Sequence, residues 1–149
     1  GEDPRFIARR LIILASEDIG NADPRGLTIA VAAMQSVEFI GMPEARITLA
    51  QATTYLATAP KSNRSYEAIA KAIHDVETGT VQPVPEHLKN VHVDAIGAEE
   101  NIGYKYPHSY AGAWTEQAYL RIPETYYVPS EQGYEATIGK RMEALRGAF

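Results

Sequence analysis

Helix-capping residues recur at close intervals in the N-terminal half of the chain and cut its apolar runs into short helices. Asp23 offers an N-cap side chain, and Pro24 after it has the preset φ of a first helical turn. Gly20 and Gly41 suit the left-handed position that ends a helix, and Pro43 can start the next one. This part of the sequence therefore predicts three or four helices joined by tight corners.

Helical periodicity extends this pattern to an all-α fold with about five main helices. We expect them from Pro4 to Asp18 behind an Asp3 cap, from after Asp23 to Ile40, from Pro43 to Thr58, from Ser62 or Asn63 to Gly79, and from Glu131 to Leu145 behind a Ser130 cap. Prolines break the intervening chain into an irregular aromatic segment, with at most a helical turn at Glu86 to Asn90.

Each predicted helix carries apolar residues at helical spacing, and these are the expected buried positions. They are Ile7, Leu11, Leu14 and Ala15; Leu27, Ala30, Val31, Met34 and Val37; Ile47, Ala50 and Thr54, with Leu49, Ala52 and Ala57 elsewhere on the same helix; Tyr66, Ile69, Ala70, Ile73 and Val76; and Tyr134, Ile138, Met142 and Leu145. The second and third helices are apolar or small on more than one side, which favours association with another molecule.

The composition bounds the class of protein. A chain of 149 residues, 45% hydrophobic and 22% charged, suits one compact domain over residues 1–149. Cysteine is absent, as in proteins of a reducing compartment, and the net charge of −5 disfavours a surface built mainly for nucleic acid. No apolar run approaches the length of a membrane span. Because the chain starts with Gly1, we expect an expressed fragment of a longer protein.

Several irregular, turn-rich strings carry a family resemblance, among them ASEDIG, VEFIGMPEARI, YLATAPKSN, PVPEHL and GYKYPH. In these strings and their order, the chain resembles the C-terminal region of the replication-associated recombination protein A family, also called RarA or MgsA. These are clamp-loader-like AAA+ ATPases. The segment from Val91 to Asn101 departs from the family pattern, and Ser109 stands where the family pattern has an acidic residue.

The resemblance implies a helical domain like the clamp-loader collar, which joins ATPase subunits into a homotetramer. It also implies that the nucleotide-binding and lid domains, with ATP and Mg²⁺, precede Gly1. The parent protein is then expected in the cytoplasm at the nucleoid, acting on DNA and replication-fork proteins such as single-stranded-DNA-binding protein. DNA replication, recombination and repair at stalled forks are the implied processes, with no membrane partner.

Motifs for catalysis, cofactors or metals are not expected in the chain itself. Gly139-Lys140-Arg141 lies inside the last predicted helix, without the strand and upstream glycine of a phosphate loop. The four histidines are His74, His87, His92 and His108. None of them forms a paired metal-binding motif, so we expect them to be scattered surface or packed residues rather than metal ligands. The acidic residues near Gly20 lack the alternating ligands of a calcium loop.

Charges placed against helix dipoles indicate ion pairing. Glu17 and Asp18 lie at the C-terminal end of the first helix, and Arg25 lies at the start of the second. We expect structural or interface pairs, within the chain or with a second copy, among Glu17, Asp18, Asp23, Arg25 and Arg46.

Two segments are candidate ligand sites. Cations and cap side chains meet at a helix start in Lys61, Ser62, Asn63 and Arg64, which could hold an anion, although a capped helix with solvated cations is the favoured alternative. Aromatic rings interleave with a base in Tyr104, Lys105, Tyr106, His108, Tyr110 and Trp114, which could stack unpaired nucleotides, although packing in a core or interface is favoured.

Three functional classes follow from these observations. A non-catalytic assembly module is the leading interpretation. A nucleic-acid-binding module that uses Lys61 to Arg64 and the loop from Tyr104 to Trp114 is the alternative, and the net charge weighs against it. A small-molecule enzyme is the third class. The sequence weighs against it, because it shows no nucleophile, base and orienting acid at motif spacing.

Overall fold

The computed structural model describes residues 1–79, 81–89 and 103–147. The regular structure of these residues is helical, with five α-helices and no strand, which confirms the predicted all-α fold. The chain divides into two compact units, Gly1–Ile73 with Tyr126–Phe149, and His74–Thr125. The single domain over residues 1–149 stays a prediction. The divergent segment from Val91 to Asn101 lies outside the described residues.

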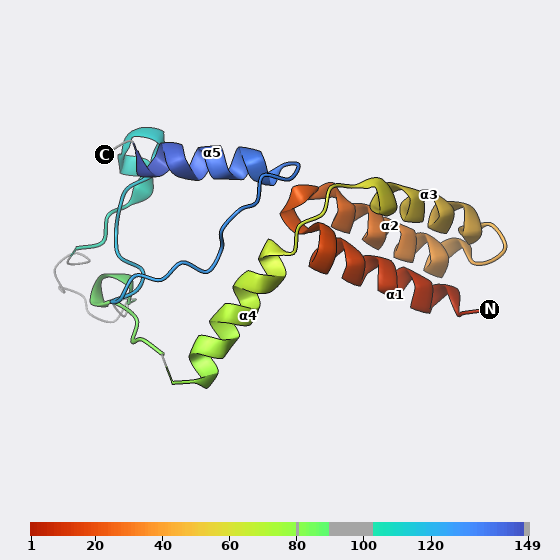
Figure 1. The fold of residues 1–149 in the computed structure, drawn as a ribbon, viewed down its shortest axis with the longest axis horizontal. Helices are drawn as coiled ribbons and strands as arrows, with labels where there is room; N and C mark the ends of the chain where they lie inside the picture. The colour runs from red at the N-terminus through yellow and green to blue at the C-terminus, as the bar shows by residue number, and fades with distance from the viewer. Residues whose placement is uncertain (80, 90–102, 148–149) are drawn as a thin grey trace, which may run out of the picture. The chain divides into compact units, whose positions relative to one another are not determined.

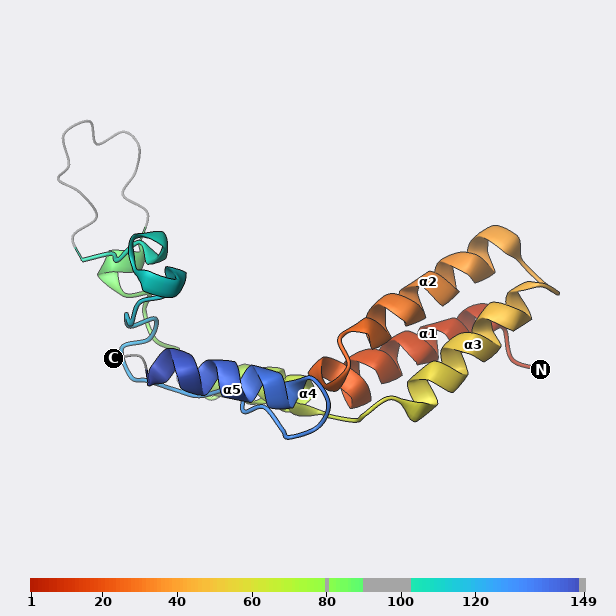
Figure 2. The ribbon, with the colours of Figure 1, turned by 90° about the horizontal axis from the view of Figure 1, so that it is seen from above.

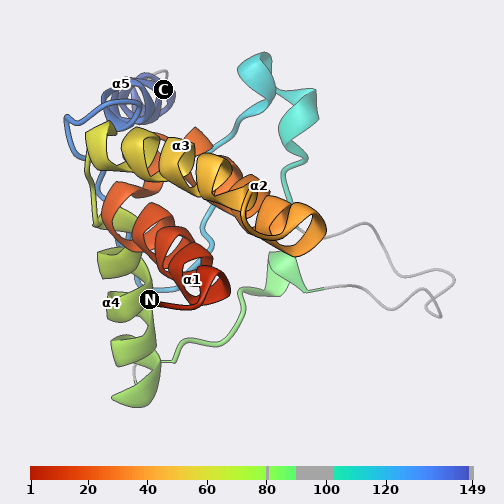
Figure 3. The same ribbon diagram turned by 90° about the vertical axis from the view of Figure 1, so that its right-hand side faces the viewer.

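Three helices form the body of the first unit. They are α1 (Pro4–Leu14), which continues as a π-helical turn over Ala15–Ile19, α2 (Arg25–Ile40) and α3 (Ala45–Thr58). They lie side by side, with α2 antiparallel to α1 and α3 (Figure 1). Figure 2 and Figure 3 show the same arrangement from two other sides. The three predicted helices are confirmed, to within two residues at the start of α3.

The predicted corners are made by the expected residues. Asp3 Oδ1 accepts a hydrogen bond from the Arg5 N–H at 2.8 Å and so caps α1. Gly20, at φ +50°, ends the first helix, and Gly41, at φ +73°, ends α2. These caps explain why α1, α2 and α3 fold back on one another within a few residues.

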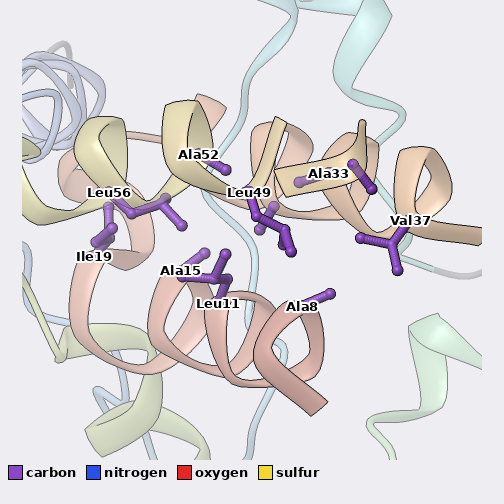
Figure 4. Packing of buried hydrophobic residues seen from close by; sticks show 11 residues of the cluster. Ala8, Leu11, Ala15, Ile19, Ala33, Val37, Leu49, Ala52 and Leu56 are labelled. Atoms are coloured by element: carbon purple, nitrogen blue, oxygen red, sulfur yellow. The ribbon is translucent and has the colours of Figure 1, made fainter. Parts of the chain in front are cut away.

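A seam of small side chains holds the three helices together. Its buried residues come from all three helices and the π-turn (Figure 4): Ala8, Leu11, Ala15, Ile19, Ala30, Ala33, Val37, Ala45, Leu49, Ala52 and Leu56. Six of the eleven are alanines, so the backbones can approach closely. The core is therefore narrow rather than bulky.

This seam corrects the predicted burial. Burial is confirmed for four predicted positions, Leu11, Ala15, Ala30 and Val37. The predicted burial is wrong for Ile7, Leu27 and Ile47, which have 37%, 43% and 67% of their surface exposed. The helices face one another through their alanines, because these permit the closest approach, and the larger side chains a few positions away stay outside. A prediction based on large apolar residues therefore identifies the buried side of these helices only in part.

Helix α4 (Arg64–Glu77) confirms the fourth predicted helix but not its burial, because none of its residues is buried. Helix α5 (Glu135–Arg146) begins four residues later than the predicted Glu131. The delay has a local cause: residues 131–134 form a turn with Gly133 at φ +53°. Ser130 Oγ accepts from the Gln132 N–H at 3.2 Å and donates to the Glu135 carboxylate, so it lies at this turn, five residues before α5 begins.

The second unit is built from turns and glutamine bridges. Its described residues include short 3₁₀ turns at Glu86–Leu88, which confirms the predicted helical turn there, and at Pro107–Ser109 and Ala111–Ala113. The Gln82 amide donates to the Ile122 carbonyl at 3.0 Å and accepts from the Ile122 N–H at 2.6 Å. Each such bridge replaces a pair of backbone hydrogen bonds.

Candidate functional site

The Glu135 carboxylate at the start of α5 is the centre of a buried polar cluster. No part of Glu135 is exposed. It accepts hydrogen bonds from Ser62 Oγ at 2.7 Å, Tyr127 OH at 2.7 Å, Ser130 N at 2.8 Å and Ser130 Oγ at 2.5 Å. The segment around Ser62 and the segment from Tyr127 to Glu135, which are distant in sequence, therefore meet at one side chain.

Hydrogen bonding keeps this carboxylate charged. Burial alone would raise the pKa of Glu135, but the hydrogen bonds from Ser130, Ser62 and Tyr127 outweigh burial and lower the pKa below its ordinary value. Burial and the negative Glu135 raise the pKa of Tyr127, against a hydrogen bond from Asn21. The cluster is thus a carboxylate held by neutral donors, which fits structural anchoring better than proton transfer.

A second carboxylate, Asp23, ties the corner between α1 and α2 to α3. Tyr55 OH donates to its Oδ2 at 2.5 Å, and Arg25 approaches Oδ1 with Nε at 3.2 Å and its backbone N–H at 3.2 Å. Burial would raise the pKa of Asp23, but the hydrogen bonds from Tyr55 and Arg25 lower it overall. Asp23 is thus both the predicted helix cap and an ion-pair partner.

This geometry corrects the predicted partner of Arg25. Its ion pair is with Asp23, two residues earlier, and not with Glu17 or Asp18 across the turn. Gly20 and the 3₁₀ turn Gly20–Ala22 bring Asp23 to the start of α2, where it is the nearest carboxylate. Asp18 contributes its carbonyl instead, which accepts from Ser62 N at 2.7 Å. A role for Glu17, Asp18 or Arg46 at an interface stays a prediction.

The predicted anion-binding residues have partners inside the protein. Lys61 Nζ donates to the carbonyls of Leu56 at 2.9 Å and Ala57 at 3.2 Å and so caps the end of α3. Ser62 Oγ accepts from the Arg64 N–H at 3.3 Å. Asn63 and Arg64 both reach the Glu67 carboxylate, at 3.1 and 2.7 Å. This arrangement is that of a capped helix start, and anion binding there stays a prediction.

The predicted stacking loop lies in the second unit, with most of its rings at the surface. The rings of Tyr106 and His108 lie 5.2 Å apart, tilted by 51°. Lys105 Nζ donates to the Glu116 carbonyl at 3.1 Å, and the Gln117 amide bridges the Lys105 backbone. Tyr104, Tyr106, His108 and Tyr110 are exposed and Trp114 is half-buried. These hydrogen bonds join Lys105 to residues 116 and 117, and stacking on nucleotides stays a prediction.

One side of α4 carries a row of exposed apolar side chains, here called the α4 stripe. It consists of Tyr66, Ile69, Ile73 and Val76, which are 53%, 58%, 49% and 63% exposed. The half-buried side chains of the same helix include the smaller Ser65, Ala68 and Ala72. Since exposed β-branched and aromatic residues at helical spacing are unusual on a solvated helix, the α4 stripe is the strongest candidate interaction surface in the described part of the chain.

The histidines, the Gly139 segment and the apolar helices bear on metal, phosphate and membrane binding in the described part of the chain. Among residues 1–79, 81–89 and 103–147, no group of three or more histidines and acids is arranged to hold a metal ion. His87 Nε2 instead lies 2.8 Å from the Ala118 carbonyl, and His92 is not among the described residues. Gly139 to Arg141 lie inside α5, as predicted. No helix in the described part is long and apolar enough to cross a membrane.

Comparison with known families settles the relationship that the sequence strings indicate. The family model described as MgsA AAA+ ATPase C terminal matches residues 1–146. The chain belongs to this MgsA C-terminal family. The predicted resemblance is therefore confirmed over almost the whole chain.

Curated relatives agree with membership in the MgsA family. An AAA domain-containing protein of Mycobacterium tuberculosis is 50% identical, over 98% of this chain and 33% of its own length. Proteins named replication-associated recombination protein A are 44% identical in Bacillus subtilis, over 88% of this chain, and 38% identical in Escherichia coli, over 97%. They are covered over 32% and 34% of their own length. The chain thus spans about a third of these relatives.

The residues that tie this MgsA-family domain together were largely missed from the sequence. Glu135, Tyr127, Asn21 and Tyr55 were not singled out, although Ser62 and Asp23 were. Ser130 and Tyr127 lie five and eight residues before Glu135, whereas Ser62 lies 73 residues away and Asn21 lies 106 residues from Tyr127.

Proposed function

We propose that this chain is the C-terminal oligomerisation domain of a DNA-dependent AAA+ ATPase that acts in DNA replication, recombination and repair at stalled forks. The names of the relatives in Bacillus subtilis and Escherichia coli support a role in replication and recombination, and membership in the MgsA family supports an AAA+ ATPase parent. We further propose a collar-like arrangement in a homotetramer, in the cytoplasm at the nucleoid.

The α4 stripe is the observation that carries this proposal. Its four large apolar side chains are each about half exposed or more in a single copy of the chain. Covering them removes apolar surface from water, and this stabilises association by about 25 cal/mol for each Å² of apolar surface buried. In a cyclic or dihedral oligomer the same stripe recurs on every subunit, so one sequence feature can serve all interfaces of one kind.

Catalysis is assigned to the parent protein rather than to this chain. Both buried carboxylates, Glu135 and Asp23, are occupied by hydrogen bonds from side chains of the same domain. We propose that ATP and Mg²⁺ bind upstream domains, and that DNA and single-stranded-DNA-binding protein are partners of the whole assembly. Saturable one-to-one binding of Mg-ATP to this chain in calorimetry would contradict the assignment.

Sedimentation equilibrium of the chain at micromolar concentrations tests the proposed assembly. We expect a mass that rises with concentration above the 16.4 kDa of one chain. A monomer mass that does not change with concentration would contradict the proposal. Titration with single-stranded DNA at two salt concentrations tests the nucleic-acid alternative, because binding through Lys61 to Arg64 or Lys105 would weaken steeply with salt.

A further inference from the structure

The turn between α2 and α3 presents an apolar surface that the α1–α3 core does not use. Phe39 is 93% exposed, Ile40 is 53% exposed and Met42 is 55% exposed. We call these three residues the tip patch. Gly41, between them at φ +73° and ψ −177°, ends α2. Exposure of these three apolar side chains to water is unfavourable in the isolated chain, and covering them would lower the free energy.

The tip patch lies beside the point where the chain enters the domain. The Arg5 guanidinium binds the Glu38 carboxylate with Nε–Oε1 at 2.8 Å and an Nη2–Oε2 hydrogen bond at 2.9 Å. This two-point contact holds the first turn of α1 against the residue that precedes Phe39. Figure 1 and Figure 2 both show the N-terminus and the α2–α3 turn at the same end of the three helices.

We propose that the tip patch is the docking surface for the portion of the same polypeptide that immediately precedes Gly1, the AAA+ ATPase part of the parent. The inference rests on the proposed function in one respect, namely that an ATPase portion precedes this chain. About two-thirds of each curated relative lies outside the matched segment, and the matching family is a C-terminal one. A domain attached at Gly1 therefore starts next to Phe39.

The size of the tip patch favours a tethered occupant over a second copy. Stable interfaces between separate molecules bury about 1,200–2,000 Å² in total, which three side chains cannot provide. A covalently attached domain needs far less contact, because a short connection gives it an effective concentration in the millimolar range.

Backbone hydrogen exchange in the full-length parent tests this assignment. We expect the amides from Phe39 to Glu44 to exchange at least tenfold more slowly in the parent than in this chain. In the parent, Phe39→Ser should abolish that protection, whereas Val76→Ser, at an exposed apolar position on α4, should keep it. Because neither side chain is in the core, both variants are expected to fold.

Three outcomes would overturn the docking of the upstream portion on the tip patch. The first is equal exchange in the parent and in this chain, and the second is protection that survives Phe39→Ser. The third is loss of self-association in Phe39→Ser, which would assign the tip patch to a second copy. Sedimentation of the unsubstituted chain reports on the proposed oligomerisation separately, so failure of one proposal is distinguishable from failure of the other.

Discussion

Ser62 Oγ lies 2.7 Å from Glu135 Oε2, and this buried hydrogen bond joins residues 73 positions apart in the sequence. Ser62 lies in the connection between α3 and α4, and Glu135 starts α5. The Tyr134 N–H donates to the Ala22 carbonyl at 2.8 Å and adds the α1–α2 corner to the same junction. Within the first unit, residues 126–147 are thus joined to residues 1–73 at the N-terminal end of α5.

Removing the central carboxylate should loosen this junction. In Glu135→Ala the donors of Ser62, Tyr127 and Ser130 lose their acceptor in a buried site, and we expect the free energy of unfolding to fall by about 2–4 kcal/mol. Urea unfolding followed by circular dichroism measures this change. The control Glu143→Ala, at an exposed position of the same helix, should leave the midpoint unchanged. Equal effects of the two substitutions would contradict the role of Glu135.

Acid should destabilise the domain through the same group. The pKa of Glu135 is lowered in the folded state from its ordinary value of 4.5, so the folded state binds its proton less tightly than the unfolded state. Its contribution is present above about pH 4.5 and is lost as the pH falls through the lower folded pKa. Chemical denaturation between pH 6 and about pH 3 should therefore show a loss that is smaller in Glu135→Gln. Parallel pH profiles would contradict this assignment.

Gly133 should be intolerant of any side chain. A Cβ at this position would lie 2.1 Å from the Ala22 carbonyl oxygen and 2.7 Å from Pro60 Cγ, and φ is +53°. We expect Gly133→Ala to cost about 3 kcal/mol or more in unfolding free energy, from overpacking and left-handed strain together. Gly79→Ala is the matched control, because φ is +87° there and nothing lies within 4 Å of the added Cβ. A similar cost at both glycines would show that only strain matters.

The Asp23 contacts predict an order of effects. Tyr55→Phe removes a 2.5 Å hydrogen bond to a buried carboxylate and should lower the unfolding free energy more than Arg25→Ala, because the Arg25 side chain is 80% exposed. Asp18→Ala and Arg25→Ala should be additive in a double-mutant cycle, since the two residues have different partners. A coupling energy between Asp18 and Arg25 in this cycle would contradict the observed pairing and support the one predicted from the sequence.

Local features of this fold could be predicted from the sequence, because their causes are local. Asp3, Gly20 and Gly41 act within one or two residues, so the ends of α1 and α2 follow from capping chemistry. The start of α5 was missed because Ser130 Oγ, which accepts from the Gln132 N–H, also donates to Glu135, and the chain turns at Gly133 before α5 begins. That choice depends on Ser62, which no local pattern brings near.

Burial was harder to predict than helicity. Periodicity identifies an apolar side of α4 but not its partner, and its large residues are exposed in this structure while smaller ones are half-buried. In α1 to α3 the seam follows alanines, whose hydrophobicity is modest but whose size permits close approach. A single sequence thus indicates which surfaces are apolar, and a structure is needed to decide which of them the isolated chain covers.

Charges placed in the α4 stripe should separate assembly from folding. Ile69 and Ile73 are 58% and 49% exposed in the single chain, so Ile69→Lys with Ile73→Lys removes little from its core. If the α4 stripe forms the contact between copies, burying two ammonium groups there should weaken self-association at least tenfold, measured by sedimentation velocity. The thermal midpoint at low concentration should change by no more than a few degrees.

Ala57→Lys with Thr58→Lys, at exposed positions at the end of α3, is the charge-matched control and should keep the assembly. An unchanged association constant in the α4 variant, or equal losses in both variants, would mean that copies of the chain associate through another surface.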